Sequence, residues 1–335
     1  MKAVEISEYG NASVLKIREY PDFSDGAHAI QSTLNAEKVL VDVHWAGVNF
    51  VDIYQREGRY PGTELPLRLG IEGSGVVRIA AENSGFKAGQ RVAFTTGVQG
   101  TYASQIWVPE ANVVVVPDAI SLKVACAAIE HGLTADMLVN DVAHISAGQT
   151  VLVHAAAGGV GGILVQLLKQ KDVRVIGTVS SASKAAWLTS IGVEAVRYDG
   201  AHDWLDAVKK MTDQRGVDLV FDSVGQATFQ SSLDILALRS HLILFGAASG
   251  IVEPVSPSAL MKKSATLTRP VLPHYIGDRD ALRARASRLF KSIDQASLQI
   301  RLDSVFELEN VSEAHELLES RRSSGKILLR VQGVD

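Results

Sequence analysis

The most constraining feature of this chain is an alternation of short apolar runs and helical segments that begins near Val151. The apolar runs are Val151–His154, Val173–Val179, Val193–Tyr198, Val217–Asp222 and Leu242–Gly246, and the helical segments among them include Gly161–Gln170, Trp204–Met211 and Thr228–Leu238. This alternation is typical of parallel strands joined by crossover helices. Parallel sheets are buried on both faces, which explains why these runs are continuously apolar. The sequence therefore predicts a doubly wound α/β domain over residues 126–267.

The residues before this domain have a different pattern, in which short β-type runs are separated by Gly, Pro, Asn and Asp. The runs are Val39–Val43, Gly75–Ile79, Arg91–Phe94, Tyr102–Val108 and Val113–Val116. They predict a mostly antiparallel β domain. After Leu267 follow a charged helix, Arg279–Ala296, a strand around Val305, a helix at Val311–Arg321 and a strand at Ile327–Val331. This tail is too short for its own core, so we expect it to complete the first domain, as residues 1–125 and 268–335.

Composition narrows the class of protein. The 335 residues are 47% hydrophobic and 21% charged, as in ordinary globular proteins, and the net charge of −4 gives no general attraction to nucleic acid or anionic membranes. The single cysteine, Cys126, excludes an intramolecular disulfide and a zinc site built from several thiolates, and it suits the reducing cytoplasm. With no secretory signal and no apolar run of about 18 residues, we expect a soluble cytoplasmic protein.

A glycine-rich turn follows the first strand of the α/β domain and opens its first helix. The segment from His154 to Gly161 reads HAAAGGVG. This is the context of a dinucleotide-binding fingerprint, with Ala156, Gly158 and Gly161 at its three small positions and Gly159 and Val160 between them. The backbone N–H groups of such a turn bind a pyrophosphate. Alanine at the first position requires a turn conformation that alanine tolerates.

The end of the second strand favours a phosphorylated cofactor. A site specific for NAD carries an acid about 20 residues after the turn, where it binds the ribose 2′-hydroxyl. Here the strand ends at Gly177 to Ser181 without an acid, and Lys184 follows. Lys184 would pair with a 2′-phosphate, with Ser180, Ser181 and Tyr198 as hydroxyl donors; the alternative is a solvated surface lysine. The implied cofactor is NADPH.

Two later strand ends face the same edge of the predicted sheet. They are Asp222–Gly225 and Phe245–Gly250. Ligands of open α/β sheets bind outside the carboxyl ends of the strands. We therefore expect ribose and nicotinamide to be lined by residues of these turns, namely Ser223, Phe245, Gly246, Ala247 and Ser249.

Several segments, spread over nearly the whole chain, resemble sequence motifs of one known family and occur in the same order. They are Ala46–Tyr54, Gly58–Pro61, Gly70–Gly75, His154–Gly161, Phe221–Gly225, Leu267–Pro270 and Ser324–Lys326. In these segments the chain resembles the zinc-free quinone oxidoreductases, relatives of zeta-crystallin in the medium-chain dehydrogenase/reductase superfamily. The resemblance implies a GroES-like, mostly β catalytic domain interrupted by a Rossmann domain with a doubly wound parallel sheet.

The resemblance also implies site residues. Asn49 looks like a contact to the nicotinamide ribose, Thr134 a nicotinamide-side contact, and Lys326 a second cation near the adenosine phosphate. Tyr54, Tyr60 and Arg269 resemble catalytic residues that line the substrate cleft.

The resemblance argues against a metal centre. Zinc-containing relatives have a cysteine and a histidine where this chain has Val48 and Ile71, so no metal is expected. The dispersed His131, His154 and His274 are interpreted as structural or surface residues, because they form no i,i+4 pair.

The implied activity is NADPH-dependent reduction of quinones by hydride transfer from C4 of the nicotinamide, in a homodimer or tetramer. A close alternative is reduction of α,β-unsaturated carbonyl compounds, which needs the same hydride donor. A third alternative is a non-enzymatic role, because some zeta-crystallins serve as lens proteins or bind RNA. The acidic balance of charge counts against RNA as the main ligand.

Overall fold

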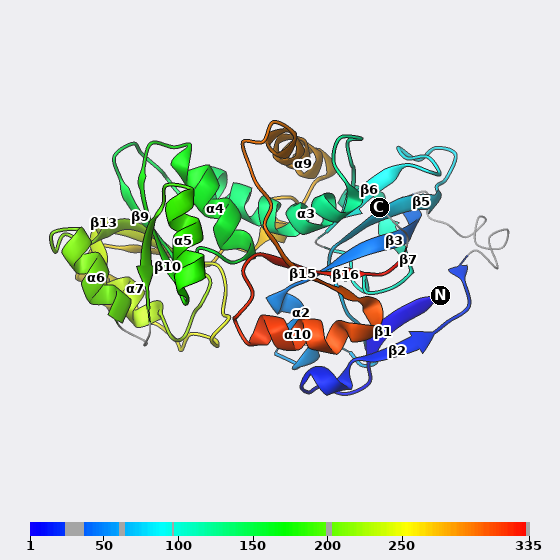
Figure 1. Ribbon diagram of the computed structural model, residues 1–335, viewed down its shortest axis with the longest axis horizontal. Helices are drawn as coiled ribbons and strands as arrows, with labels where there is room; N and C mark the ends of the chain where they lie inside the picture. The colour runs from blue at the N-terminus through cyan, green and yellow to red at the C-terminus, as the bar shows by residue number, and fades with distance from the viewer. Residues whose placement is uncertain (24–36, 60–63, 96, 199–202, 333–335) are drawn as a thin grey trace. The chain divides into compact units, whose positions relative to one another are not determined.

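The computed structural model describes residues 1–23, 37–59, 64–95, 97–198 and 203–332. The chain divides into two compact units, and Figure 1 labels many of their helices and strands. Unit 1 comprises Met1–Leu133 and Ile276–Asp335, and unit 2 comprises Thr134–Tyr275. Both boundaries lie slightly later in the chain than the predicted 125/126 and 267/268. The first falls inside helix α3 (Leu122–Met137), and the second falls after the last strand of unit 2.

Unit 2 contains a six-stranded sheet in which every pairing is parallel. The strand order is β11-β10-β9-β12-β13-β14, so the order reverses between β9 and β12. This is the doubly wound order that places dinucleotides at the point of reversal. The strands are β9 (Thr150–Val153), β10 (Arg174–Val179), β11 (Glu194–Arg197), β12 (Val217–Asp222), β13 (Leu236–Leu244) and β14 (Thr266–Thr268).

Helices cover both faces of this sheet. They are α4 (Gly159–Lys169), α5 (Ala182–Ser190), α6 (Asp203–Met211), α7 (Phe229–Asp234) and α8 (Ser258–Met261), with helical turns at Leu138–Val142 and Leu272–His274. Crossover connections between parallel strands are right-handed, so α4 and α5 lie on one face and α6 and α7 on the other. On the second face, Trp204 and Leu233 share a buried apolar cluster with Leu152, Val220 and Leu242.

The segment after β12 differs from the prediction. Its apolar pattern predicted a helix at Thr228–Leu238, but α7 ends at Asp234 and β13 begins at Leu236. Leu236 pairs with Val217 of β12, and the Val217 N–H donates to the Ile235 carbonyl at 2.9 Å. A short apolar run fits a helix and a strand equally well. Here pairing with the buried strand β12 makes the run a strand from Leu236 onward.

The described residues of unit 1 form two sheets. A seven-stranded sheet has the order β15-β16-β3-β5-β6-β8 with β7 also paired to β3, and a second sheet has the order β2-β1-β4. Every pairing in them is antiparallel except β15 with β16. The strands are β1 (Lys2–Ile6), β2 (Lys16–Glu19), β3 (Lys38–Val48), β4 (Leu67–Arg68), β5 (Gly73–Ile79), β6 (Arg91–Phe94), β7 (Gln105–Pro109), β8 (Val113–Val115), β15 (Leu302–Glu307) and β16 (Lys326–Arg330).

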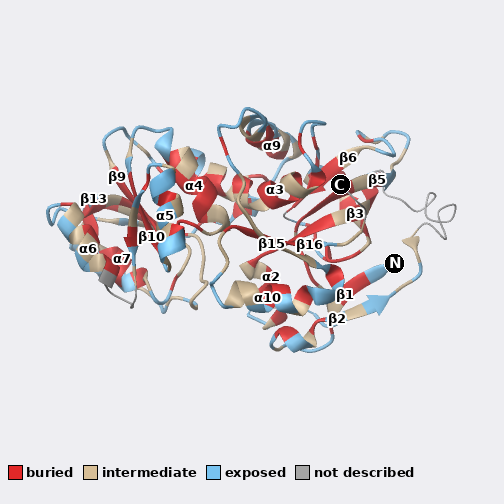
Figure 2. Ribbon diagram, viewed as in Figure 1, coloured by how far each residue is buried: buried red, intermediate tan, exposed pale blue. Residues whose placement is uncertain are grey.

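The carboxyl-terminal tail completes unit 1. Besides β15 and β16 it contains α9 (Arg279–Asp294) and α10 (Val311–Glu319), while α2 (Phe50–Arg56) follows β3. Ile327 of β16 lies opposite Val48 of β3, and both belong to an apolar cluster that includes Val4 and Leu69. Figure 2 shows β3 and β5 largely buried. The tail therefore packs on the amino-terminal β domain, as its length predicted.

Candidate functional site

The turn between β9 and α4 is tightly constrained. Ala155 has a φ of 50°, which is uncommon for a residue with a side chain. The unusual backbone conformation of this turn is therefore at Ala155 and not at Ala156, the first small position of the fingerprint. The Ala156 N–H donates to the Thr178 carbonyl at 3.1 Å, and the Gly158 N–H donates to the Ala155 carbonyl at 2.9 Å. A Cβ on Gly161 would lie 2.3 Å from the Ala155 carbonyl oxygen. Glycine at this position therefore allows α4 to approach the turn.

The start of α4 suits an anion. Gly158 is the N-cap of α4, and Gly158, Gly159 and Val160 are half-buried, whereas Ala156 and Ala157 are buried. The first N–H groups of a helix have no acceptor within it and carry partial positive charge. The turn also lies where the strand order reverses. These features fit the pyrophosphate of a dinucleotide.

Gly177 has a packing role in this region. It is buried within β10, and a Cβ on it would lie 2.7 Å from the Cβ of Ala156 and 2.8 Å from Cδ1 of Leu188. Its lack of a side chain lets the turn and α5 lie against β10. Gly177, predicted as a cofactor residue, therefore shapes the turn from inside the sheet.

The carboxyl ends of β10 and β11 gather a cation and hydroxyl groups. Lys184, only 9% exposed, holds its Nζ 3.4 Å from Oγ of Ser180. Ser181 caps α5 by accepting the Lys184 N–H at 3.3 Å. The Tyr198 N–H donates to the carbonyl of Val179 at 3.1 Å, which places Tyr198 beside the end of β10. Four predicted phosphate-binding residues thus share one edge of the sheet.

This edge carries no competing carboxylate in the stretch from Gly177 to Tyr198. The one acid of that stretch, Glu194, is at the beginning of β11, away from the carboxyl end. Both of its carboxylate oxygens accept from the Arg174 guanidinium, at 2.7 and 2.8 Å, and this pairing lowers the pKa of Glu194. The one acid of this stretch is therefore paired with Arg174 and does not lie at the carboxyl end of β11.

A buried carboxylate organises the turn after β12. Oδ1 of Asp222 accepts the N–H groups of Val224 and Gly225 at 2.8 and 3.0 Å. The Thr228 hydroxyl donates to Oδ1 of Asp222 at 2.9 Å, and the Ser232 hydroxyl donates to Oδ2 at 2.9 Å. The sequence interpretation gave Asp222 no role of its own. An acid at the carboxyl end of a mostly apolar strand was the available signal.

The turn after β13 lies directly against the turn after β12. A Cβ on Gly246 would lie 2.4 Å from the carbonyl oxygen of Ser223. The Ala248 N–H donates to the same carbonyl at 3.2 Å, and Oγ of Ser249 donates to the Val224 carbonyl at 2.7 Å. Phe245, Gly246, Ala247 and Ser249 are all half-buried. The predicted wall residues are therefore neighbours at the carboxyl ends of β12 and β13.

In unit 1, Asn49 belongs to a buried polar cluster. Its amide nitrogen donates to Oε1 of Glu72 at 2.7 Å, and its amide oxygen accepts from Nζ of Lys326 at 2.7 Å. Nε2 of His131 lies 3.0 Å from that amide oxygen. Burial, reinforced by the Lys326 charge, lowers the pKa of His131 well below its usual range. Asn49 is 7% exposed, and these contacts fix the orientation of its amide.

Lys326 has partners within unit 1. Its ammonium group, 1% exposed, forms an ion pair with the fully buried Glu72 and also donates to the Val48 carbonyl at 3.3 Å. Removing one partner of a buried ion pair, or drawing it to another ligand, leaves an unpaired buried charge and strongly destabilises the protein. The expected role as a second cation at the adenosine phosphate is not supported by this environment. We therefore leave Lys326 out of the proposed phosphate site.

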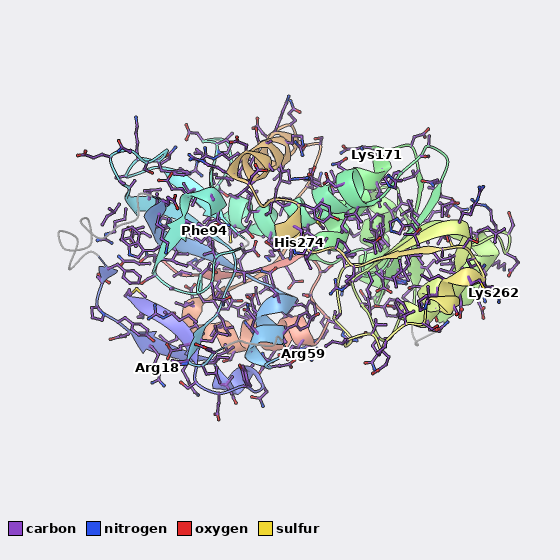
Figure 3. The ribbon with its side chains drawn as sticks, turned by 180° about the vertical axis from the view of Figure 1, so that it is seen from behind. Arg18, Arg59, Phe94, Lys171, Lys262 and His274 are labelled. Carbon is purple, nitrogen blue, oxygen red and sulfur yellow. The ribbon has the colours of Figure 1, made fainter. Side chains whose placement is uncertain are left out.

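Helix α2 carries Tyr54. The Tyr54 ring is half-buried; the Phe50 ring centroid lies 6.2 Å away, and the Arg59 guanidinium lies 5.3 Å from the Tyr54 centroid. Figure 3 labels Arg59 near α2. Tyr60, the other predicted cleft tyrosine, lies outside the described residues.

The first turn of α2 is anchored by a buried acid. Asp52 accepts the Asn49 N–H and the Tyr102 hydroxyl, both at 2.8 Å. Burial raises the pKa of Asp52 to about 7. The beginning of α2, and with it the Asn49 backbone, is therefore coupled to the protonation of one side chain.

The remaining predicted residues belong to unit 2. Arg269 follows β14, is exposed, and donates to the carbonyl of Leu244 at 3.1 Å, which ties it to the end of β13. Thr134 is half-buried in α3. Because Tyr54 and Asn49 belong to unit 1, their proximity to Arg269 and Thr134 stays a prediction.

Within the described ranges, no group of three or more His, Cys, Asp or Glu side chains is arranged to hold a metal ion. No helix in the same part of the chain has the length and apolarity needed to cross a membrane. The thiol of Cys126 is free and buried, as its apolar neighbours predicted.

Comparison with known proteins gives matches along the chain. Residues 35–118 match the family model described as the alcohol dehydrogenase GroES-like domain, and residues 159–291 match the model described as zinc-binding dehydrogenase. A quinone oxidoreductase of Pseudomonas aeruginosa is 36% identical over 98% of this chain and 99% of its own. A 2-haloacrylate reductase of a Burkholderia species is 32% identical over 85% of this chain and 88% of its own.

A solved structure agrees with these sequence matches. The crystal structure of the Escherichia coli quinone oxidoreductase complexed with NADPH has a TM-score of 0.91 and 32% identity, and the match covers 99% of this chain and 100% of that one. The fold class predicted from the sequence, a GroES-like β domain with a Rossmann domain, is confirmed. The chain therefore belongs to the quinone oxidoreductase family of the medium-chain dehydrogenase/reductase superfamily.

Proposed function

We propose that this protein reduces quinones with NADPH and needs no metal to do so. The observation that carries the proposal is the edge formed by the carboxyl ends of β10 and β11, where the Lys184 ammonium lies 3.4 Å from Oγ of Ser180 and the Tyr198 N–H donates to the Val179 carbonyl. Membership of the quinone oxidoreductase family, and the NADPH named for the E. coli structure, support the same cofactor.

The residues present suit NADPH along the whole sheet edge. The first N–H groups of α4 would bind the pyrophosphate, and Lys184 would pair with the 2′-phosphate in a charge-assisted contact. The turns at Ser223 and Gly246 would enclose the ribose and the nicotinamide, because they close against each other at the ends of β12 and β13. Asn49 and Thr134 would approach the nicotinamide side, as the family resemblance implies.

When bound, NADPH supplies a hydride from C4 of its nicotinamide, so the protein contributes orientation and electrostatics. Negative charge develops on the quinone oxygen as the hydride arrives. The guanidinium of Arg269 would stabilise that charge, and the hydroxyl of Tyr54 or Tyr60 would orient the ring or donate a proton. The Leu244 carbonyl fixes one nitrogen of Arg269 and leaves its other donors for an acceptor.

Metal independence is proposed from the residues at two positions. Val48 and Ile71, with apolar side chains, occupy the places at which zinc-containing relatives carry ligands, according to the family resemblance. Neither side chain can coordinate a metal. The buried Glu72 next to Ile71 is paired with Lys326 instead.

A second candidate substrate class is favoured by one relative. The match named 2-haloacrylate reductase suggests that an activated carbon–carbon double bond can be the hydride acceptor on this scaffold. Reduction of α,β-unsaturated carbonyl compounds uses the same cofactor site. The two candidates therefore differ only in the acceptor.

The test is NADPH oxidation at 340 nm against a panel of small quinones and of enals or enones, each repeated with NADH. The proposal expects turnover of quinones, a strong preference for NADPH, and slower turnover of enals. Faster turnover of enals would select the second candidate. Absence of NADPH oxidation with every acceptor, in protein that binds NADPH, would contradict both.

We also propose a homodimer, with a tetramer as the alternative assembly, in the cytoplasm. The edge strand β14 and the exposed side chains of Leu238 and Met261, 74% and 77% exposed, support self-association of unit 2. The single, buried cysteine suits a reducing compartment. Light scattering coupled to size exclusion would measure the assembly, and a monomer at micromolar concentration would refute it.

A further inference from the structure

A buried hydrogen-bond chain runs beneath the turns of unit 2, and its centre is His154. This residue directly precedes the strained turn at Ala155, and its side chain is 1% exposed. Nδ1 of His154 lies 2.9 Å from Oγ1 of Thr178 on β10, and Nε2 lies 3.0 Å from Oγ of Ser232 on α7. The imidazole also packs edge-on against the Trp204 ring, with the centroids 4.6 Å apart. One side chain therefore contacts three other elements.

The chain continues to the turn after β12. Oγ of Ser232 donates to Oδ2 of Asp222 at 2.9 Å, and Oδ1 of Asp222 accepts the N–H groups of Val224 and Gly225. The His154 N–H also donates to the Phe221 carbonyl at 2.9 Å, immediately before Asp222. The order Thr178–His154–Ser232–Asp222 thus joins the end of β9 to the turn that follows β12.

The direction of each hydrogen bond follows from the carboxylate. An ionised carboxylate only accepts, so the single hydroxyl proton of Ser232 points to Asp222. Oγ of Ser232 must then accept from His154, which places the imidazole proton on Nε2. The hydroxyl of Thr178 donates to the remaining lone pair on Nδ1. Burial lowers the pKa of His154, which favours this neutral form.

The chain supports two turns that carry strain or close contacts. Thr178 holds the first turn twice, through its side chain to His154 and through its carbonyl to the Ala156 N–H at 3.1 Å. Asp222 holds the second turn, in which Gly225 has a φ of 88°. Without these anchors, the first turn can relax from the positive φ of Ala155, and the second turn can leave the conformation that Asp222 holds.

We propose that His154, Ser232 and Asp222 are positioning residues, which hold the two turns in the conformation that binds the dinucleotide. This inference rests on the proposed function, because it takes both turns to face NADPH. The expected signature is weaker NADPH binding with little change in kcat at saturating NADPH, since none of the three residues is proposed to touch the reacting atoms.

The test compares neighbouring serines on one helix. Ser231 and Ser232 are both buried in α7, at 4% and 0% exposed, and Ser232 is the one whose hydroxyl lies 3.0 Å from Nε2 of His154 and donates to Asp222. We expect Ser232→Ala to raise the Kd of NADPH about tenfold, the effect of roughly one hydrogen bond, and Ser231→Ala to leave it within about twofold. Equilibrium binding is followed by NADPH fluorescence, and folding by the melting temperature.

Variants of the histidine test the direction of the chain. His154→Gln keeps an N–H donor near the position of Nε2, whereas His154→Asn reaches only toward Thr178. We expect Gln to restore NADPH affinity to within about threefold of the parent and Asn to lose about tenfold. In the parent protein, the imidazole 15N–1H spectrum is expected to show the proton on Nε2. This measurement decides the tautomer even where a histidine variant does not fold.

The outcomes separate this inference from the proposed function. Failure of the parent protein to bind NADPH contradicts the proposed function itself. Tight binding by the parent with unchanged Kd in Ser232→Ala, whatever its melting temperature, would make the chain purely structural and overturn the inference. Equal Kd values for the Gln and Asn variants, or an imidazole proton on Nδ1, would overturn it as well.

Discussion

Replacing Lys184 with alanine is expected to remove most of the preference for NADPH over NADH. The Lys184 side chain is only 9% exposed, and Ser180 lies 3.4 Å from its ammonium, so its charge is held in place and poorly screened by solvent. A hydrogen bond to a charged group contributes roughly 1.5–3 kcal/mol, which corresponds to about a ten- to hundredfold change in Kd. NADPH affinity should fall by this factor, while NADH affinity should change little, because NADH has no 2′-phosphate.

The assay is equilibrium fluorescence titration of both cofactors into the parent, Lys184→Ala and Lys184→Met. The methionine variant keeps most of the buried volume, so it separates lost charge from lost packing. Lys171→Ala is the matched control, because Lys171 (labelled in Figure 3) is an exposed lysine of unit 2 that contacts Asn140. The assignment would be refuted if the ratio of NADPH affinity to NADH affinity stayed the same in the Lys184 variants, whether both affinities fell equally or neither changed.

Three further predictions concern the raised pKa of Asp52, the independence of activity from metal, and the role of Arg269 in the substrate cleft. Burial holds the pKa of Asp52 near 7, above the value of 3.8 for an unburied carboxyl, so ionising it lowers stability as pH rises between these values. Asp52→Asn should therefore gain stability over the parent between pH 4 and 7 in urea unfolding, by at most about 4 kcal/mol; a pH-independent difference would contradict the argument. Dialysis against a chelator should leave the rate of quinone reduction intact, and stoichiometric zinc whose removal abolishes the rate would refute metal independence. Arg269→Leu should lower kcat and kcat/KM together by about a hundredfold, with NADPH affinity unchanged, in single-turnover measurements; a parental rate would show that Arg269 only lines the cleft.

The α/β half of the fold was predictable because its signal is local and repeated. Each strand of a parallel sheet is buried on both faces, so Val217–Asp222 could be read directly from its apolar run, and its bounds agree with β12. The helix predicted at Thr228–Leu238 was too long, because no local sequence signal shows where helical hydrogen bonding ends and pairing with β12 begins. The boundary is set by the tertiary contact with β12.

The site was only partly predictable. A glycine-rich turn has a recognisable pattern, so the sequence indicated the segment from Ala156 to Gly161 as a candidate cofactor turn, and the missing acid after β10 pointed to Lys184 as a candidate phosphate ligand. The partners of Lys326 were not visible, because Glu72 is 254 residues away in sequence and an isolated lysine gives no sign that it is buried. The buried chain through His154 was missed for the same reason: Thr178, Ser232 and Asp222 come from three different elements.

The pairing of β16 with β3 sets an order of events during synthesis on the ribosome. All six strands of the parallel sheet lie between residues 150 and 268, so that sheet is available as soon as this continuous stretch has emerged. The amino-terminal β-sheet, translated earlier, already pairs β3 with β5 and β7, but it must wait for residues 326–330 before Trp45–Val48 of β3 gain β16 as a partner. Until then Glu72 has no ammonium partner, and a buried carboxylate without one is costly. We therefore expect the half of the protein that is made first to mature last.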